Sequence, residues 1–390
     1  MKDFGLAGES IVCFAGEDWW YHHPHIENRL MRRLAGRNKI LFVNSITMGL
    51  PSVSNPDFFL KVKRKLRSYR KWLKKVPEGL WVMTPISLPL YGSRFGRWIN
   101  RSLLVLQLRF VMLLLGMRQP VVLACIPTAV DVVCRLGGEV LLYQVCDKVE
   151  ANEDSALSPH VIHELDHKMK EMADIVIYNG KRLFDEAMES NRYYLPVGVD
   201  YDLFANLPGE PAPDAADLPR PLLGYFGAMD FMMDTELIAD VAHRRPDWHW
   251  MLIGNRSNVI RLSGTNLHFL GPRPLTDLPK YVTRFDVCVL PWRADNRFAS
   301  YGSAMKVREY MATGKPVVIA PLYEYLNTPG IRIYRSVDEF VALVEDSLKN
   351  DSPKAATERQ AVVRNGTWDD RARELCNLIC SIREYKRYEY

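Results

Sequence analysis

The sequence predicts an α/β protein built from two doubly wound domains that follow each other along the chain. Apolar runs typical of buried parallel strands alternate with helical patterns from one end to the other. The alternation is interrupted once, at residues 207–221, where the run LPGEPAPDAADLPRP holds five prolines among polar residues. With 390 residues, 48% of them apolar, the chain can bury two cores of medium size.

The first domain is expected over residues 1–205, with a parallel sheet that helices cover on both faces. Its strands are predicted by seven near-continuous apolar runs, at residues 10–16, 39–45, 80–85, 121–127, 140–146, 174–180 and 193–197. Between these runs, helical periodicity is found at residues 26–36, 94–116 and 159–173.

The second domain is expected over residues 222–366, after a linker at residues 206–221. Its strands are predicted at residues 222–227, 249–254, 267–270, 286–291, 316–320 and 331–334, and its helices at residues 235–243, 275–283, 304–313 and 337–349. Residues 367–390 predict a last helix that packs back toward the N-terminal domain. Thr367 suits its N-cap, and Asp369 and Asp370 suit the positive end of its dipole.

Cysteine usage and hydropathy favour a cytoplasmic protein. The seven cysteines lack paired C-x-x-C spacing and several lie in apolar strand-like runs, which indicates buried free thiols in a reducing compartment. The first ten residues hold no apolar signal core. The most apolar helical stretch, residues 102–116, is too short to span a bilayer and carries Arg109.

The segment from Tyr301 to Ile319, YGSAMKVREYMATGKPVVI, carries the strongest chemical signal. Small residues open a helix, and Lys306 lies in its first turn, so free backbone N–H groups and an ammonium together favour a diphosphate. Glu309, one turn further along, can accept two hydrogen bonds from a ribose diol. The alternative is a Lys–Glu pair on the surface of an amphipathic helix.

The run GYFGAMD, residues 224–230, ends the first strand of the second domain. Glycine at Gly224 and Gly227 lets a phosphate or sugar approach the backbone closely, although a tight strand-to-helix turn needs the same residues. The run does not fit G-x-G-x-x-G, so the nicotinamide dinucleotide fingerprint is absent.

These motifs resemble those of a known family. SAMKVREYMATGKPVV, residues 303–318, resembles the donor-binding helix of group-1 (family 4) glycosyltransferases, which have the GT-B fold, and of related exopolysaccharide transferases. Four further segments resemble parts of that family in the right order: LPVGVDYDLF, GYFGAMD, NLHFLGPRPLTDLPKYV and FDVCVLPWR. The resemblance implies that the helix start holds the donor diphosphate, that Glu309 binds the ribose, and that residues 271–273 lie near the base. The implied donor-binding set is Gly227, Gly254, Gly271, Arg273, Ser303, Ala304, Met305, Lys306 and Glu309.

One position departs from the family pattern. Many retaining members carry an acid eight positions before the ribose-binding glutamate, where this chain has Tyr301. The stereochemistry of transfer therefore stays open. The chain looks closer to exopolysaccharide-type members, including glucuronosyltransferases, in which an acidic residue of the first domain acts as base.

Asp147 is the candidate base, because it follows the predicted strand VLLYQVC at its carboxyl end. The alternative role for Asp147 is a helix N-cap. Glu17 and Asp18, which follow the first strand, are rival acids, with contact to the acceptor as their favoured role. The expected acceptor-binding set is Gly16, Glu17, Asp18, His25 and Asn44.

No metal site is expected. Asp200-Tyr201-Asp202 forms a D-x-D, but it lies at the domain boundary rather than in a donor loop. His22, His23 and His25 are so close in an extended stretch that they rarely all face one ion. No cofactor is expected beyond the donor substrate itself, a UDP or GDP sugar, because helix-terminal amides and Lys306 can neutralise the leaving diphosphate.

Residues 1–120 hold 20 Lys and Arg against 7 Asp and Glu, although the whole chain has a net charge of only +5. The excess is concentrated from Lys61 to Lys75, KVKRKLRSYRKWLKK, where Leu66, Trp72 and Leu73 lie among the cations. This pattern predicts a basic helix at an anionic membrane surface, with a solvated basic helix as the alternative. No nucleic-acid module surrounds it.

Together these features predict transfer of a hexosyl or glucuronosyl unit from a nucleotide sugar to an acceptor hydroxyl. The expected acceptor is a lipid-linked saccharide in bacterial polysaccharide assembly, reached by peripheral attachment to the inner face of the plasma membrane. Two alternatives remain: a GT-B-like epimerase of sugar nucleotides, and a catalytically inactive sugar-nucleotide-binding protein, which the missing acid at Tyr301 supports.

Overall fold

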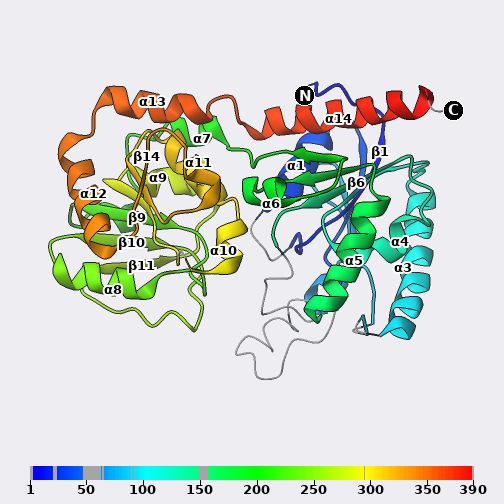
Figure 1. The fold of residues 1–390 in the computed structure, drawn as a ribbon, viewed down its shortest axis with the longest axis horizontal. Helices are drawn as coiled ribbons and strands as arrows, with labels where there is room; N and C mark the ends of the chain where they lie inside the picture. Colours follow the sequence, from blue (N-terminus) through cyan, green and yellow to red (C-terminus); the bar gives the residue numbers. More distant parts are fainter. Residues whose placement is uncertain are drawn as a thin grey trace. The chain divides into compact units, whose positions relative to one another are not determined.

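The computed structural model describes residues 3–20, 24–46, 63, 66–88, 90–91, 93–148, 157–293 and 295–388. The chain divides into two compact units, each built on one sheet (Figure 1). Unit 1 comprises Met1–Val197 and Trp368–Tyr390, and unit 2 comprises Gly198–Thr367.

The sheet of unit 1 has eight strands in the order β3-β4-β2-β1-β5-β6-β7-β8. All pair in parallel except β3, which is antiparallel to β4. The central strands are buried along almost their whole length, because helices cover both faces of a parallel sheet. The strands are β1 (Ser10–Phe14), β2 (Lys39–Val43), β3 (Leu73–Lys75), β4 (Trp81–Met83), β5 (Val121–Ala124), β6 (Val140–Val145), β7 (Ile175–Tyr178) and β8 (Arg192–Tyr194).

The helices of unit 1 are α1 (Ile26–Leu34), α3 (Arg94–Leu114), η1 (Pro127–Ala129), α4 (Val130–Val133), α5 (Pro159–Met172), α6 (Lys181–Glu186) and α14 (Trp368–Tyr388). The last of these, α14, contacts α1 and β6 although it is far away in sequence (Figure 1). Leu375, Cys376 and Ile379 are buried at helical spacing on one of its faces. At its start, Asp369 accepts a hydrogen bond from Arg33 of α1 at 2.9 Å.

The sheet of unit 2 has six parallel strands in the order β11-β10-β9-β12-β13-β14. They are β9 (Leu222–Phe226), β10 (His249–Ile253), β11 (Leu267–Gly271), β12 (Val287–Leu290), β13 (Val317–Ile319) and β14 (Ile331–Ile333). The helices are α7 (Tyr201–Ala205), η3 (Pro213–Ala215), α8 (Thr235–Arg244), η4 (Leu275–Asp277), α9 (Leu278–Val282), α10 (Arg297–Tyr301), α11 (Met305–Ala312), η5 (Tyr323–Tyr325), α12 (Val337–Asn350) and α13 (Pro353–Val363).

The proline-rich segment packs on unit 2 rather than lying apart from it. Ala212 and Ala215 are buried in the core of that unit, and the Ala212 N–H donates to the Lys280 carbonyl at 3.2 Å. The preceding helix, α7, places the Phe204 ring 5.8 Å from that of Phe226. Small apolar residues between the prolines therefore anchor a segment whose composition alone is typical of a linker.

The basic segment from Lys61 to Lys75 is not a single helix, which corrects the sequence prediction. Residues 66–69 are helical, but β3 follows and pairs with β4 through Leu73 and Met83. The edge of the sheet offers unpaired backbone groups, and pairing with it outweighs the helical pattern of the cations. Residues 61, 62, 64 and 65 lie outside the described residues.

Every apolar run predicted to form a strand contains or overlaps one, whereas β3 was missed. Among the described residues, no helix combines the length and apolar character needed to cross a bilayer.

Candidate functional site

The loops after β9 and β10 place two glycines in contact at the carboxyl end of the unit 2 sheet. The Gly227 N–H donates to the Ile253 carbonyl at 2.8 Å, and the Gly254 N–H donates to the Gly271 carbonyl at 2.9 Å. Gly227 and Gly254 have φ values of 139° and 146°, which side chains rarely allow. A Cβ on Gly254 would overlap the Gly227 carbonyl oxygen, and a Cβ on Gly227 would lie 2.6 Å from Cε of Lys306. The glycines therefore let the Lys306 side chain pass directly over the backbone.

Lys306 extends from the first turn of α11 toward one aromatic residue within β9 and one that follows β12. Its Nζ lies 4.5 Å from the centre of the Trp292 ring, after β12, and 5.2 Å from that of Tyr225, in β9. Removal from water lowers the pKa of Lys306 to about 8, against the opposing effect of the Asp230 and Glu309 carboxylates. Burial raises the pKa of Asp230, and Lys306 opposes that rise. The Lys306 ammonium lies in a partly apolar environment, where its attraction to a bound anion would be stronger than in water.

The start of α11 offers backbone donors in the same region. Its N-cap, Ala304, makes no side-chain hydrogen bond to the first turn, and the Tyr325 hydroxyl holds the Ala304 carbonyl at 2.9 Å. Ser303 and Met305, on either side of Ala304, are half-buried. An uncapped helix N-terminus next to an ammonium combines backbone donors and positive charge, which favour a bound anion.

Glu309 and Arg273 occupy the remaining predicted donor positions. Glu309 is buried, one turn after Lys306 on α11. Arg273 follows β11, and its guanidinium donates to the Asp214 carboxylate at 2.6 Å and to the Tyr281 hydroxyl at 2.6 Å. The structure thus links Gly227, Gly254 and Lys306 by direct contact, whereas Arg273 is hydrogen-bonded to η3 and α9.

In unit 1, Asp18 and Asn44 form a buried hydrogen-bonded cluster at the carboxyl ends of β1 and β2. Asn44 accepts from the Trp19 N–H at 2.9 Å, and its amide donates to the Thr84 hydroxyl at 3.0 Å and to Asp18 Oδ2 at 3.4 Å. Asp18 also accepts from the Ser68 hydroxyl at 2.8 Å. These partners hold the loop after β1, so internal contacts occupy polar atoms that the sequence assigned to the acceptor.

Three carboxyl groups and an imidazole interact near the ends of β1 and β6. Glu27, in the first turn of α1, is buried and accepts from the Gly16 N–H at 3.3 Å. Burial raises the pKa of Glu27, and Glu17 adds to the rise while His25 opposes it. Burial also raises the pKa of Asp147; His25 again opposes the rise, and Glu17 and Glu27 add to it. A carboxyl group with a raised pKa binds a proton more readily than an ordinary carboxylate does, which suits a general base.

Asp147 does not cap α5, the next helix among the described residues. Residues 147 and 148 are not helical, and α5 begins at Pro159 with Ser158 as its N-cap. Residues 149–156, His22 and His23 lie outside the described residues. Within the described ranges, no group of three or more His, Cys, Asp or Glu converges as a metal site, Asp200 and Asp202 included.

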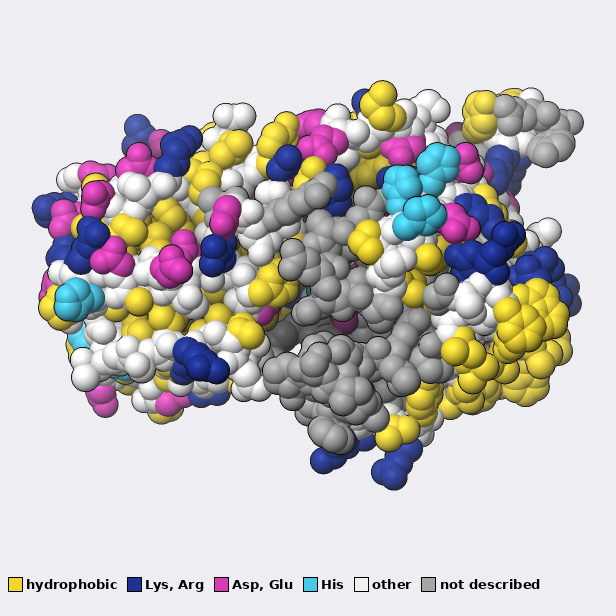
Figure 2. Space-filling model, turned by 60° about the horizontal axis from the view of Figure 1, so that its bottom comes forward, with side chains coloured by type: hydrophobic (Ala, Val, Ile, Leu, Met, Phe, Trp, Pro, Cys, Tyr) yellow, Lys and Arg dark blue, Asp and Glu magenta, His cyan; other side chains and the backbone are white. Residues whose placement is uncertain are grey.

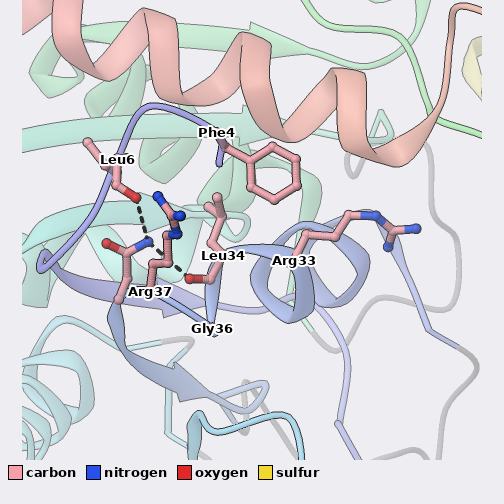
Figure 3. A pocket seen from close by; sticks show the side chains of 7 residues that line it. Phe4, Leu6, Arg33, Leu34, Gly36 and Arg37 are labelled. Atoms are coloured by element: carbon pink, nitrogen blue, oxygen red, sulfur yellow. Dashed lines mark hydrogen bonds between the residues drawn. The ribbon is translucent and has the colours of Figure 1, made fainter. Parts of the chain in front are cut away.

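A small cavity lies elsewhere in unit 1, at the end of α1 (Figure 3). Asn38 is one of the residues that line it, and its amide donates to the carbonyls of Leu6 at 3.2 Å and Leu34 at 3.0 Å. Its volume of about 40 Å³ suits a water molecule rather than a sugar nucleotide.

Comparison with known proteins links unit 2 to one family. Residues 221–350 match the family model described as glycosyl transferases group 1. The chain has the GT-B fold, and over residues 221–350 its second unit is similar to group 1 glycosyltransferases. The match begins just before β9 and ends with α12, so it includes Gly227, Lys306 and Glu309.

A curated relative is the putative teichuronic acid biosynthesis glycosyltransferase TuaH of Bacillus subtilis, which is 26% identical over 192 residues. That alignment covers 44% of this chain, and the chain spans about half the length of the relative, 46%.

Solved structures extend the likeness to the whole GT-B fold. Sucrose-phosphate synthase from Thermosynechococcus elongatus aligns with a TM-score of 0.68 at 15% identity, covering 96% of this chain and 99% of that one. HepE of Anabaena, in complex with UDP and glucose, aligns with a TM-score of 0.66 at 14% identity over 95% and 99% of the two chains. The trehalose 6-phosphate synthase of Burkholderia multivorans aligns with a TM-score of 0.65 at 13% identity, covering 99% and 100%.

Three residues of this GT-B chain escaped sequence reasoning. Asp230 and Trp292 follow strand ends, in the loops after β9 and β12, and that position was the available signal. Glu27 reads as an ordinary polar position of an amphipathic helix, and only the fold shows that it turns back to Gly16.

Proposed function

We propose that the chain is a glycosyltransferase that moves a sugar from a nucleoside diphosphate to an acceptor hydroxyl. The observation that carries the proposal is the placement of the Lys306 ammonium over Gly227 at the start of α11, inside the segment that is similar to group 1 glycosyltransferases. Such a site favours a diphosphate. It stabilises the diphosphate more strongly as the bond to the sugar breaks, because the leaving group then gains negative charge.

The donor roles follow from position. Lys306 and the first backbone N–H groups of α11, with Ser303, Ala304 and Met305 at its start, would hold the diphosphate of UDP or GDP. Glu309 would accept from the ribose hydroxyls, and Gly271 and Arg273 would border the base. No metal or other cofactor is part of the proposal, because the ammonium and the helix amides can neutralise the leaving group.

Asp147 would be the general base. It would take the proton of the acceptor hydroxyl as that oxygen bonds to the anomeric carbon, while the bond from that carbon to the diphosphate breaks. The raised pKa of Asp147 favours this role, because the carboxylate then binds a proton more readily than an ordinary aspartate. Gly16, Glu17 and His25 would contact the acceptor, and Asp18 and Asn44 would support that loop from within.

The proposed acceptor is a lipid-linked saccharide in bacterial polysaccharide assembly, with a hexosyl or glucuronosyl unit as the transferred sugar. The proposed location is the cytoplasmic face of the plasma membrane, with peripheral attachment through unit 1. The basic excess of residues 1–120 supports this location, and so does the polysaccharide pathway in the name of the Bacillus relative.

The test begins with thermal-shift measurements against UDP, GDP and their sugars, because a bound donor raises the melting temperature by mass action. The stabilising donor is then supplied in labelled form with lipid-linked and soluble acceptors. Transfer or hydrolysis supports the proposal. An epimerised donor would make the protein an epimerase, and binding without any reaction would make it the inactive protein that Tyr301 allows. Activity that a chelator abolishes and Mn²⁺ restores would overturn metal independence.

A further inference from the structure

Helix α3 presents an apolar face to solvent in addition to the face that it buries. Leu104, Leu108 and Val111 pack into unit 1. On the other side, Phe95, Leu106 and Leu113 are 71%, 69% and 80% exposed. Spacings of 11 and 7 residues correspond to about three and two helical turns, so these three side chains share one face. The same helix also exposes Trp98, Phe110 and Leu114.

A neighbouring segment widens this apolar surface. The Asn100 side chain pairs with both backbone groups of Leu88, at 2.7 and 2.8 Å, and Gln107 does the same for Ile86, at 3.0 and 2.9 Å. Ile86, Leu88 and Leu90 are exposed beside α3. Because helix side chains already satisfy these backbone groups, the segment can enter an apolar medium without leaving them unpaired.

The residues that form this surface include no acidic side chain. Between Glu78 and Asp131 the sequence holds five arginines and no acidic residue. Arg94, Arg97 and Arg101 recur along one side of α3, and within the described part of the chain only Arg97 of the three has an acidic partner, Glu164 at 3.3 Å. In Figure 2, hydrophobic side chains gather where α3 lies, with Lys and Arg side chains beside them.

We propose that the α3 surface, defined as α3 with residues 86–88 and 90, docks into the interface of an anionic lipid bilayer. Aromatic and aliphatic side chains would enter the boundary between headgroups and acyl chains, and the arginines would contact lipid phosphates. The proposal rests on the membrane location proposed above and assigns that role to α3 instead of a helix over residues 61–75.

Charge decides between this occupant and a second copy of the chain. A symmetric dimer through the α3 surface would bring the same patch of four arginines against itself, with no acidic residue from this stretch to compensate. An anionic bilayer supplies both the apolar phase and the missing negative charge.

The experiment is flotation of the full chain with vesicles. Vesicles containing phosphatidylglycerol should carry the protein at low salt, and binding should weaken as salt rises or when phosphatidylcholine alone is used. The double variant Leu106→Glu with Phe110→Glu should lose at least about tenfold in binding. Arg94→Gln with Arg101→Gln should lose about fivefold per arginine and flatten the salt dependence. Met188→Glu and Val259→Glu, at exposed apolar positions outside the α3 surface, are the controls and should bind like wild type.

Two further readouts make every outcome decisive. The melting-temperature shift with UDP reports that each variant is folded with its donor site intact. Light scattering reports the oligomeric state, and a wild-type dimer that Leu106→Glu splits, without vesicle binding, would overturn the proposal in favour of self-association. Failure to bind vesicles with intact sugar transfer would refute the α3 inference alone. Vesicle binding without any transfer would leave it standing and refute the proposed function.

Discussion

The Lys306 ammonium lies 4.5 Å from the centre of the Trp292 ring. A Cβ added to Gly227 would lie 2.8 Å from Nζ of Lys306. The ring offers attraction but little hydration, so the cation keeps a pKa of about 8, below that of an exposed lysine. A ligand phosphate in contact with this nitrogen would replace the hydration that the ammonium loses on burial.

Lys306 should make diphosphate binding depend on pH. Below a pKa of about 8 the side chain is charged, and above it the charge is lost. UDP affinity, measured by calorimetry, should therefore fall as the pH rises from about 7 to about 9, with proton uptake on binding near the pKa. Lys306→Ala should weaken UDP by about 1.5–3 kcal/mol and remove this dependence. The control is Lys349→Ala, because Lys349 is exposed on α12. Equal UDP affinity in wild type, Lys306→Ala and Lys349→Ala would show that Lys306 is not part of the donor site.

Glu309 should act on the nucleoside rather than on the phosphates. Glu309→Gln and Glu309→Ala should weaken uridine or guanosine as well as the diphosphate, because the hydrogen bonds to ribose are shared by both ligands. Lys306→Ala should leave the nucleoside unaffected. A Glu309 variant that loses only diphosphate binding would contradict the ribose assignment.

Asp147→Asn should keep donor affinity and lose about 10²–10⁴-fold in transfer, the range that a general base contributes. Because the pKa of Asp147 is raised, wild-type kcat/KM should fall as pH drops through that raised value, and the Asn variant should lack this acidic limb. Asp202→Asn, exposed on α7, serves as control. Near-normal turnover by the Asp147 variant would move the role to Glu27 or Glu17.

Glu27 should reduce stability at neutral pH. Its pKa is raised in the folded protein, so the folded state binds the proton more tightly than the unfolded chain does. The free energy of unfolding therefore decreases as pH rises above about 4.3, the pKa of an unfolded glutamate, until the raised folded value is passed. Glu27→Gln keeps an acceptor for the Gly16 N–H and removes the charge. Its melting temperature should exceed that of wild type at pH about 8, and the difference should shrink at pH about 5. Glu358→Gln, exposed on α13, should show no such trend.

Gly254→Ala should destabilise unit 2 by at least about 1–3 kcal/mol, because the new Cβ meets the Gly227 carbonyl at a φ that alanine avoids. Chemical denaturation gives the change. Gly302→Ala is the matched control, since the nearest atom to its Cβ is 3.5 Å away and its φ is ordinary. Similar stability for both variants would show that the loops after β9 and β10 adjust freely.

In unit 2, the predictions of strands and of the donor site rest on local sequence patterns. The run from β9 to Gly227, and the step from small residues to Lys306 in α11, are visible in short windows of sequence. Features that depend on partners elsewhere in the chain were not predicted. Strand β3 forms because β4 offers an edge to pair with. Glu27 is placed to accept from the Gly16 N–H only by the fold of unit 1. The proline-rich stretch shows the same limit, since Ala212 and Ala215 are buried only when unit 2 is present to receive them.

The return of α14 to unit 1 has a consequence for biosynthesis. Unit 2 is one continuous stretch, whereas unit 1 joins Met1–Val197 to Trp368–Tyr390. On the ribosome, unit 2 can therefore finish folding while α1 and β6 still lack the cover that α14 provides. A polypeptide arrested before Trp368 would hold a finished second unit and an unfinished first one. For recombinant expression, residues 198–367 form one continuous fragment that contains all of unit 2. A fragment of unit 1 would need α14 joined to Met1–Val197.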